Sequence, residues 1–403
     1  MFGRLISSAI KAGLPGRIIK YEVMVYYDKR WVIDCIMDDE QQAIAHAKSL
    51  LLANEKNEQV RVVRQRSMLS GFTTETPIFE QVRPPKKKKE IGLSASINAA
   101  PACANLDDFF GHDARVLMNR LFREFFDSLV ITPTELLHNY GYIKKLDATG
   151  NLITSAVYQV AQAQANAGQG SVKDRVNTLF RLVDEVKMRA RDTLAERKRL
   201  PVLEAGQFGL LCRRAEARFE PQDRRYMILF TLSNYLAGSR NWGQKLEQIG
   251  KLFTDDVDGD GIAILDGVVA DVLGAGAMIQ ELLGPQPNLG AALGLLADIA
   301  MARTDAPPKT ASESLKLLLR LIQKHDMPDS RTVLLDRLRR ELRSAKPLCR
   351  DGLNAEREEL NKLEARLRDP SGALVGGAEM EQIFANRVEQ IRRAHLRAAG
   401  VAT

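Results

Sequence analysis

The sequence predicts an α+β N-terminal domain with the order β-β-α-β-β, followed by a mainly α-helical domain built as an irregular helical bundle or array. Two observations carry this prediction. Short aromatic and β-branched runs dominate residues 21–82, whereas apolar residues recur at helical spacing after Asp107. A lysine-rich stretch of low complexity separates the two patterns.

Residues 1–20 open the chain with a short amphipathic helical pattern that stops at Gly13 and Pro15. A basic amphipathic helix can lie in a membrane interface or pack on a partner. The simpler alternative is a short helix that packs on the following domain. The residues that would form the membrane or partner face are Phe2, Leu5, Ile6 and Ile10.

Residues 21–82 form the predicted small α/β interaction domain. The runs 21–27 and 31–37 flank a short polar turn, which is the pattern of a β-hairpin. Asp38 or Asp39 can cap a helix that places Ala43 and Ala47 on one face. Residues 60–64 and 77–82 return to strand character, which is enough sheet for one helix to cover on one face.

Residues 83–106 are predicted to be a flexible linker, because Pro84 and Pro85 precede four lysines and a stretch rich in Ser, Ala and Asn. The linker lysines are Lys86, Lys87, Lys88 and Lys89. A charge run of this kind is usually solvated. The alternative is contact with phosphate, an acidic membrane surface or an acidic partner.

Residues 107–304 are predicted to form the helical domain, and residues 305–403 a C-terminal helical segment with a basic tail. Thr132, Pro133 and Glu135 are typical of a helix start with a capping box. In the C-terminal segment, interleaved acidic residues predict salt-bridged helix surfaces, with a partner-binding basic helix as the sharper alternative. The arginines concerned include Arg337, Arg339, Arg340 and Arg343. The leucines at 360, 363 and 367 could pair with another helix, but two or three turns fall short of a full coiled coil.

The distribution of charge argues against a nucleic-acid-binding domain. The formal net charge is +7, with +1 in residues 1–82, +4 in 83–106, −2 in 107–330 and +4 in 331–403. A nucleic-acid-binding domain is expected to concentrate positive charge on a folded face.

Other classes are excluded by the cysteines and by the length of the apolar runs. No apolar run reaches the roughly 18 residues that a bilayer span needs. The four cysteines are scattered without a CxxC pair, which predicts reduced thiols and neither disulfides nor a zinc site. The histidines stand singly, and no nucleophile elbow or phosphate loop is present.

The sharpest local motif is the stretch that contains Asp256, Asp258 and Asp260. It resembles the first half of a calcium-binding loop, with carboxylates at positions 1, 3 and 5 and Gly261 at position 6. Gly267 stands at position 12, where the bidentate glutamate of such a loop belongs. Calcium is therefore a weak candidate, and the alternative is an acidic turn that caps the next helix. We expect no other cofactor.

The function favoured by the sequence is that of a non-enzymatic scaffold or regulatory adaptor with protein partners. It would use its helical surfaces and the N-terminal module, in the cytoplasm or at the inner face of a membrane. One alternative is a nucleic-acid-associated regulator that uses the basic linker. Others are a peripheral membrane protein anchored by its N-terminal helix, and an enzyme whose site is assembled from distant residues.

Overall fold

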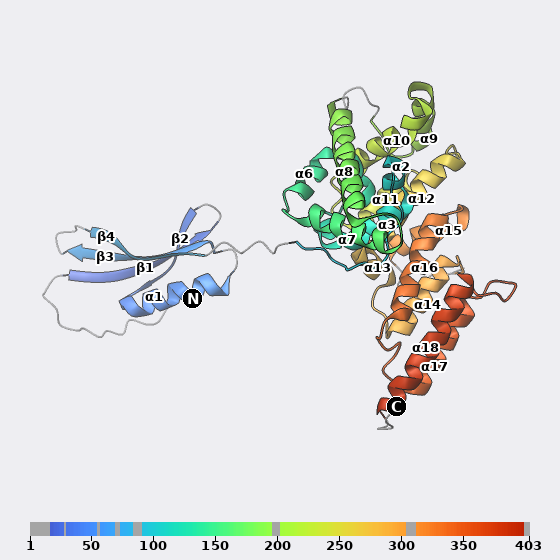
Figure 1. The fold of residues 1–403 in the computed structure, drawn as a ribbon. Helices are drawn as coiled ribbons and strands as arrows, with labels where there is room; N and C mark the ends of the chain where they lie inside the picture. Colours follow the sequence, from blue (N-terminus) through green and yellow to red (C-terminus); the bar gives the residue numbers. More distant parts are fainter. Residues whose placement is uncertain are drawn as a thin grey trace. The chain divides into compact units, whose positions relative to one another are not determined.

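The computed structural model describes residues 17–27, 30–54, 57–68, 73–83, 91–195, 202–303 and 312–398. The chain divides into two compact units, Met1–Lys89 and Glu90–Thr403. The first is a four-stranded antiparallel sheet with one helix, and the second is mainly helical (Figure 1). The predicted fold class is therefore confirmed. The predicted helix with Phe2, Leu5, Ile6 and Ile10 and the tetralysine Lys86–Lys89 lie outside the described residues.

The sheet unit has the chain order β-β-α-β-β and the spatial strand order β2-β1-β3-β4. Its elements are β1 (Arg17–Tyr27), β2 (Arg30–Met37), α1 (Glu40–Ala53), β3 (Gln59–Met68) and β4 (Thr73–Val82). Helix α1 covers one face of the sheet (Figure 1). The alternating valines of β1 and β3 pack against the small residues Ala43 and Ala47, which allow the helix to approach the strands closely.

The starts of α1, β1 and β4 and the place of a proline in β4 can be compared with the sequence. Asp39 caps α1, because its Oδ1 accepts a hydrogen bond from the backbone N–H of Gln42 at 2.8 Å. Strand β1 begins at Arg17 rather than Tyr21, and β4 begins at Thr73 rather than Pro77. Pro77 is tolerated inside β4 because this strand is at the edge of the sheet.

The second unit consists, among its described residues, of helices α2–α18. Their bounds are α2 (Leu106–Phe110), α3 (His112–Leu121), α4 (Arg123–Leu129), α5 (Pro133–His138), α6 (Tyr140–Asp147), α7 (Leu152–Asn166), α8 (Val172–Ala195), α9 (Phe208–Arg218), α10 (Pro221–Leu236), α11 (Trp242–Gly250), α12 (Gly259–Leu273), α13 (Gly276–Leu283), α14 (Leu289–Ala300), α15 (Glu313–Lys324), α16 (Pro328–Arg343), α17 (Leu353–Arg366) and α18 (Gly377–Ala398).

Two large apolar clusters form the interior of the helical unit. One extends from Ile97 to Ala190, and the larger one from Leu203 to Ile391. The larger cluster includes residues on both sides of position 305, so the predicted division there does not separate two cores. Leu360 and Leu363 of α17 and Leu367, which follows its last residue, are buried in this cluster, and α17 packs against α14 and α18 (Figure 1).

Residues 91–105, which the sequence assigns to the linker, pack on the helical unit. The backbone N–H of Ser94 donates to the carbonyl of Leu121 at 2.9 Å, and Gln164 Nε2 donates to the carbonyl of Pro101 at 2.6 Å. The side chain of Ile97 is buried. The composition of this segment misleads because a few apolar side chains and neighbouring helices are enough to hold it.

Among the described residues, no single helix has the length and apolar composition to cross a membrane. Helices α12 and α13 have the required length and apolar composition only when they are taken together, and the chain bends by 88° between them.

Candidate functional site

The helical unit contains a cleft of about 190 Å³ that is lined by arginines from two distant parts of the chain. Arg120 comes from α3, and Arg339, Arg340 and Arg343 come from α16. On α16, Arg343 lies on the same helix face as Arg339 (i, i+4) and as Arg340 (i, i+3). The other lining residues are Val116, Asn119, Gly274, Val333, Asp336 and Glu379.

Two of these arginines are already paired with carboxylates. Arg339 Nη1 donates to Asp336 Oδ1 at 2.5 Å, and Arg343 Nη2 donates to Glu379 Oε1 at 2.6 Å. Arg339 Nε also lies 3.6 Å from Glu379 Oε2. Both carboxylates of the cleft lining are therefore engaged by Arg339 and Arg343.

Arg120 and Arg340 have no ion pair with any carboxylate in the described part of the chain. Arg340 Nε donates to the backbone carbonyl of Asp336 at 3.3 Å. Burial, and then the positive charges of Arg337, Arg120 and Arg123, lower the pKa of Arg340 to about 10. The guanidinium groups therefore repel one another, and an anion placed between them would relieve this repulsion.

A buried polar network fixes α3 at the wall of the cleft. Arg115 Nε donates to Asp271 Oδ1 at 3.0 Å, and both side chains are almost fully buried. Asn119 Nδ2 donates to the backbone carbonyl of Asp271 at 2.9 Å. Asp271 Oδ2 accepts hydrogen bonds from the backbone N–H of Thr134 at 3.0 Å and from its Oγ1 at 2.6 Å. Helices α3, α5 and α12 are thus tied together next to Arg120.

The start of α16 is anchored in a similar way. Asp266, on α12, accepts hydrogen bonds from the backbone N–H groups of Asp329 at 2.8 Å and Ser330 at 3.0 Å. The Oγ of Ser330 donates to Asp266 Oδ1 at 2.5 Å. A carboxylate at a helix N-terminus satisfies free N–H groups and complements the helix dipole. Both walls of the cleft are therefore held by α12.

Gly274 allows the close contact between α12 and α3. A Cβ atom at this position would lie 2.3 Å from Asn119 Nδ2 and 3.2 Å from the carbonyl oxygen of Asp271. A side chain here would displace Asn119 from its buried hydrogen bond.

The predicted calcium motif has the geometry of a helix-capping turn. Asp258 Oδ1 accepts a hydrogen bond from the backbone N–H of Gly261 at 2.7 Å, and α12 begins at Gly259. Asp256 accepts from Thr254 Oγ1 at 2.6 Å and pairs with Arg213 at 3.2 Å. Asp260 lies in the first turn of α12. Calcium binding at Asp256, Asp258 and Asp260 remains a prediction.

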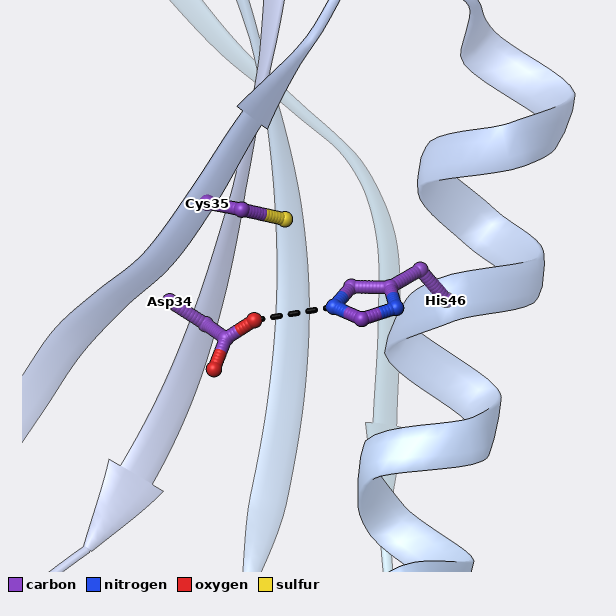
Figure 2. A group of neighbouring side chains, drawn as sticks. All are labelled: Asp34, Cys35 and His46. Carbon is purple, nitrogen blue, oxygen red and sulfur yellow. Dashed lines mark hydrogen bonds and ion pairs between the residues drawn. The ribbon is translucent and has the colours of Figure 1, made fainter.

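A different group of metal-binding side chain types occurs in the sheet unit. Ligand atoms of Asp34, Cys35 and His46 all lie within 4.8 Å of one another, the one group of three in the described part of the chain that does so. His46 Nε2 lies 2.9 Å from Asp34 Oδ2, and the Cys35 side chain points to the same side (Figure 2).

An apolar cavity of about 120 Å³ lies between helices α3 and α5–α8. Its lining is apolar apart from Gln164 and Lys187. Ligand sites combine apolar walls with a few convergent polar groups that orient the ligand. Lys187 is paired with Asp147 at 2.9 Å, so this cavity offers little to orient a ligand.

The arginines of α16 form a visible cluster in the sequence. Arg120, which lines the same cleft, does not stand out, because no local pattern connects α3 with α16. The group on β2 and α1 also has no sequence signature, because His46 is brought to Asp34 and Cys35 only when α1 packs on the sheet. No protein-family model, curated protein or solved structure matches this chain.

Proposed function

We propose that the protein is a non-enzymatic adaptor whose helical unit holds an acidic or phosphorylated segment of a partner protein in the arginine cleft. The observation that carries the proposal is the convergence of Arg120 and Arg340, both without a carboxylate partner among the described residues, on one cleft. The planar guanidinium fork matches carboxylate and phosphate groups in a bidentate geometry.

The distribution of charge favours a protein segment over nucleic acid. The cleft is a local feature with four arginines and two carboxylates in its lining. The helical unit, residues 90–403, carries 42 Lys and Arg against 41 Asp and Glu, a net charge of +1, so outside the cleft it offers an extended polyanion little net attraction. In this proposal the sheet unit is a second module on the same chain.

The test is a binding measurement with two labelled peptides, one with two phosphoserines among glutamates and a twin with alanine and glutamine at those positions. Fluorescence anisotropy would compare the wild type with the double variant Arg120→Gln/Arg340→Gln. We expect the wild type to bind the phosphorylated peptide only, and the double variant to bind it about a hundredfold more weakly, since each lost charge-assisted hydrogen bond contributes roughly 1.5–3 kcal/mol.

A matched control removes two exposed arginines of α18, Arg392→Gln/Arg397→Gln, and thus the same net charge. Its affinity should equal that of the wild type. Equal binding of both peptides, or loss of affinity in the control as large as in the cleft variant, would contradict the proposal. Stronger competition by single-stranded nucleic acid than by the phosphopeptide would favour the nucleic-acid-associated alternative.

A further inference from the structure

Strand β2 contains a β-bulge at Asp34. Cys35 is opposite Val23 of β1, and Ile33 is opposite Met24, so Asp34 is the extra residue without a partner. Successive side chains of a regular strand point to opposite faces of the sheet. The extra residue breaks this alternation, and it allows Asp34 and Cys35 to lie on the same face.

That face is the one covered by α1. Cys35 packs against the apolar core beneath the helix, and His46 extends from α1 toward β2 (Figure 2). The backbone of α1 is held in place by the buried residues Ala43 and Ala47 on either side of His46. The two ligands from the strand and the one from the helix are therefore positioned by elements that pack on each other.

We propose that Asp34, Cys35 and His46 bind a zinc ion. A thiolate, an imidazole and a carboxylate are the three side-chain types that bind Zn²⁺ in proteins. Calcium and magnesium prefer oxygen ligands alone, so the thiol and imidazole argue against these ions. The ligand atoms lie within 4.8 Å of one another. Tetrahedral zinc holds ligand atoms roughly 3.5 Å apart, which small side-chain rotations would achieve here.

Solvent can supply the fourth ligand. The side chains of His46 and Asp34 are 34% and 38% exposed, so a water molecule can reach the metal from outside. Three protein ligands and one open position are a common arrangement for zinc. The ion would replace the direct contact between His46 and Asp34, and it would connect edge strand β2 to helix α1.

The experiment uses the full chain after treatment with a chelator, with Co²⁺ as the spectroscopic probe for the zinc site. We expect one equivalent of Co²⁺ to give visible bands of a tetrahedral ion and a near-ultraviolet thiolate-to-cobalt band, both removed by added Zn²⁺. Cys35→Ser should lose the near-ultraviolet band. His46→Ala should weaken Zn²⁺ binding, measured by competition with a chromophoric chelator, by about tenfold or more.

Cys349→Ser is the control, because Cys349 is a buried thiol of the helical unit. This variant should bind Co²⁺ with the wild-type spectrum. His46 is partly exposed on α1, so His46→Ala tests the site even if Cys35→Ser does not fold. A near-ultraviolet band that persists in Cys35→Ser, or an unchanged Zn²⁺ affinity in His46→Ala, would overturn the proposal. Either outcome would leave the proposed peptide binding at the arginine cleft untouched, because the two sites lie in different units of the chain.

Discussion

At the scale of single residues, the helical unit depends on charges that are fully removed from water. Lys245 Nζ donates to both carboxylate oxygens of Glu135, at 2.6 and 2.5 Å, and neither side chain is exposed. Glu135 also completes the capping box with Thr132 at the start of α5. Removing one partner of such a pair leaves an uncompensated buried charge, which costs far more than breaking an exposed pair.

Asp271→Asn tests this point at the wall of the cleft. The variant leaves the buried guanidinium of Arg115 without its carboxylate, so we expect the free energy of unfolding to fall by about 3–5 kcal/mol. Urea unfolding followed by circular dichroism would measure it. The control is Glu389→Gln, which breaks an exposed pair with Arg393 on α18 and should cost no more than about 0.5 kcal/mol. Equal decreases in the free energy of unfolding in the two variants would show that the buried Asp271 network stabilises the protein no more than an exposed ion pair does.

His138 makes stability depend on pH. Its Nδ1–H donates to the carbonyl of Thr134 at 2.7 Å, and its ring packs between Phe110 and Tyr226. Burial lowers the pKa of His138 from 6.5 to about 3. Below pH 6.5 the unfolded chain takes up a proton that the folded chain does not, so stability is lost as the pH falls toward 3.

The slope attributable to His138 is at most about 1.4 kcal/mol per pH unit. We expect His138→Phe, which keeps an aromatic ring but cannot titrate, to lose less stability than the wild type as the pH is lowered through this window. The measurement is the free energy of unfolding at a series of pH values for both proteins. Parallel curves would contradict the assignment.

At the scale of elements, glycines set how closely helices approach each other. Helix α14 packs on α17, and a Cβ atom at Gly290 would lie 2.9 Å from the Cβ of Glu359. A Cβ atom at Gly259, the first residue of α12, would meet nothing within 4 Å. Neither position has the positive φ that favours glycine, so the two differ mainly in the space available.

Gly290→Ala should therefore force α14 and α17 apart and destabilise the protein by about 1–3 kcal/mol, as overpacking does. Gly259→Ala should be neutral or stabilising by up to about 1 kcal/mol, because alanine restricts the unfolded chain. Thermal and urea unfolding of the two variants would check the difference. A destabilised Gly259→Ala with an unchanged Gly290→Ala would contradict the packing seen here.

At the scale of the whole molecule, each of the two units has its own apolar core. The chain has two tryptophans, Trp31 in the sheet unit and Trp242 in the helical unit. Each unit can therefore be followed by fluorescence in a variant that lacks the other tryptophan. Trp31 also carries the guanidinium of Arg61 over its ring, at 4.4 Å from the centroid, so its emission should respond to loss of the sheet.

We expect Trp242→Phe, which reports the sheet unit, and Trp31→Phe, which reports the helical unit, to unfold in urea at different midpoints. The dependence on urea should be shallower for the sheet unit, because the m-value scales with the surface exposed on unfolding. A single common midpoint with a common slope would show instead that the two units unfold as one.

The fold class could be predicted from the sequence, because the periodicity of apolar residues and the helix caps that indicate it are local features. Thr132 and Glu135 form the predicted capping box, and Asp39 is one of the two predicted caps of α1. What could not be predicted depends on contacts between distant residues. Lys245 gives no local sign that it will pair with Glu135, and the β-bulge at Asp34 is determined by strand register. The packing of residues 91–105 is likewise supplied by helices far along the chain.

The most direct test of the arginine cleft is an experimental structure of the full chain with the phosphorylated peptide bound. We expect a phosphate group between Arg120 and Arg340, with the pairs Arg339–Asp336 and Arg343–Glu379 retained. A structure in which the peptide binds elsewhere, or in which Arg120 and Arg340 turn away from a vacant cleft, would contradict the proposed function.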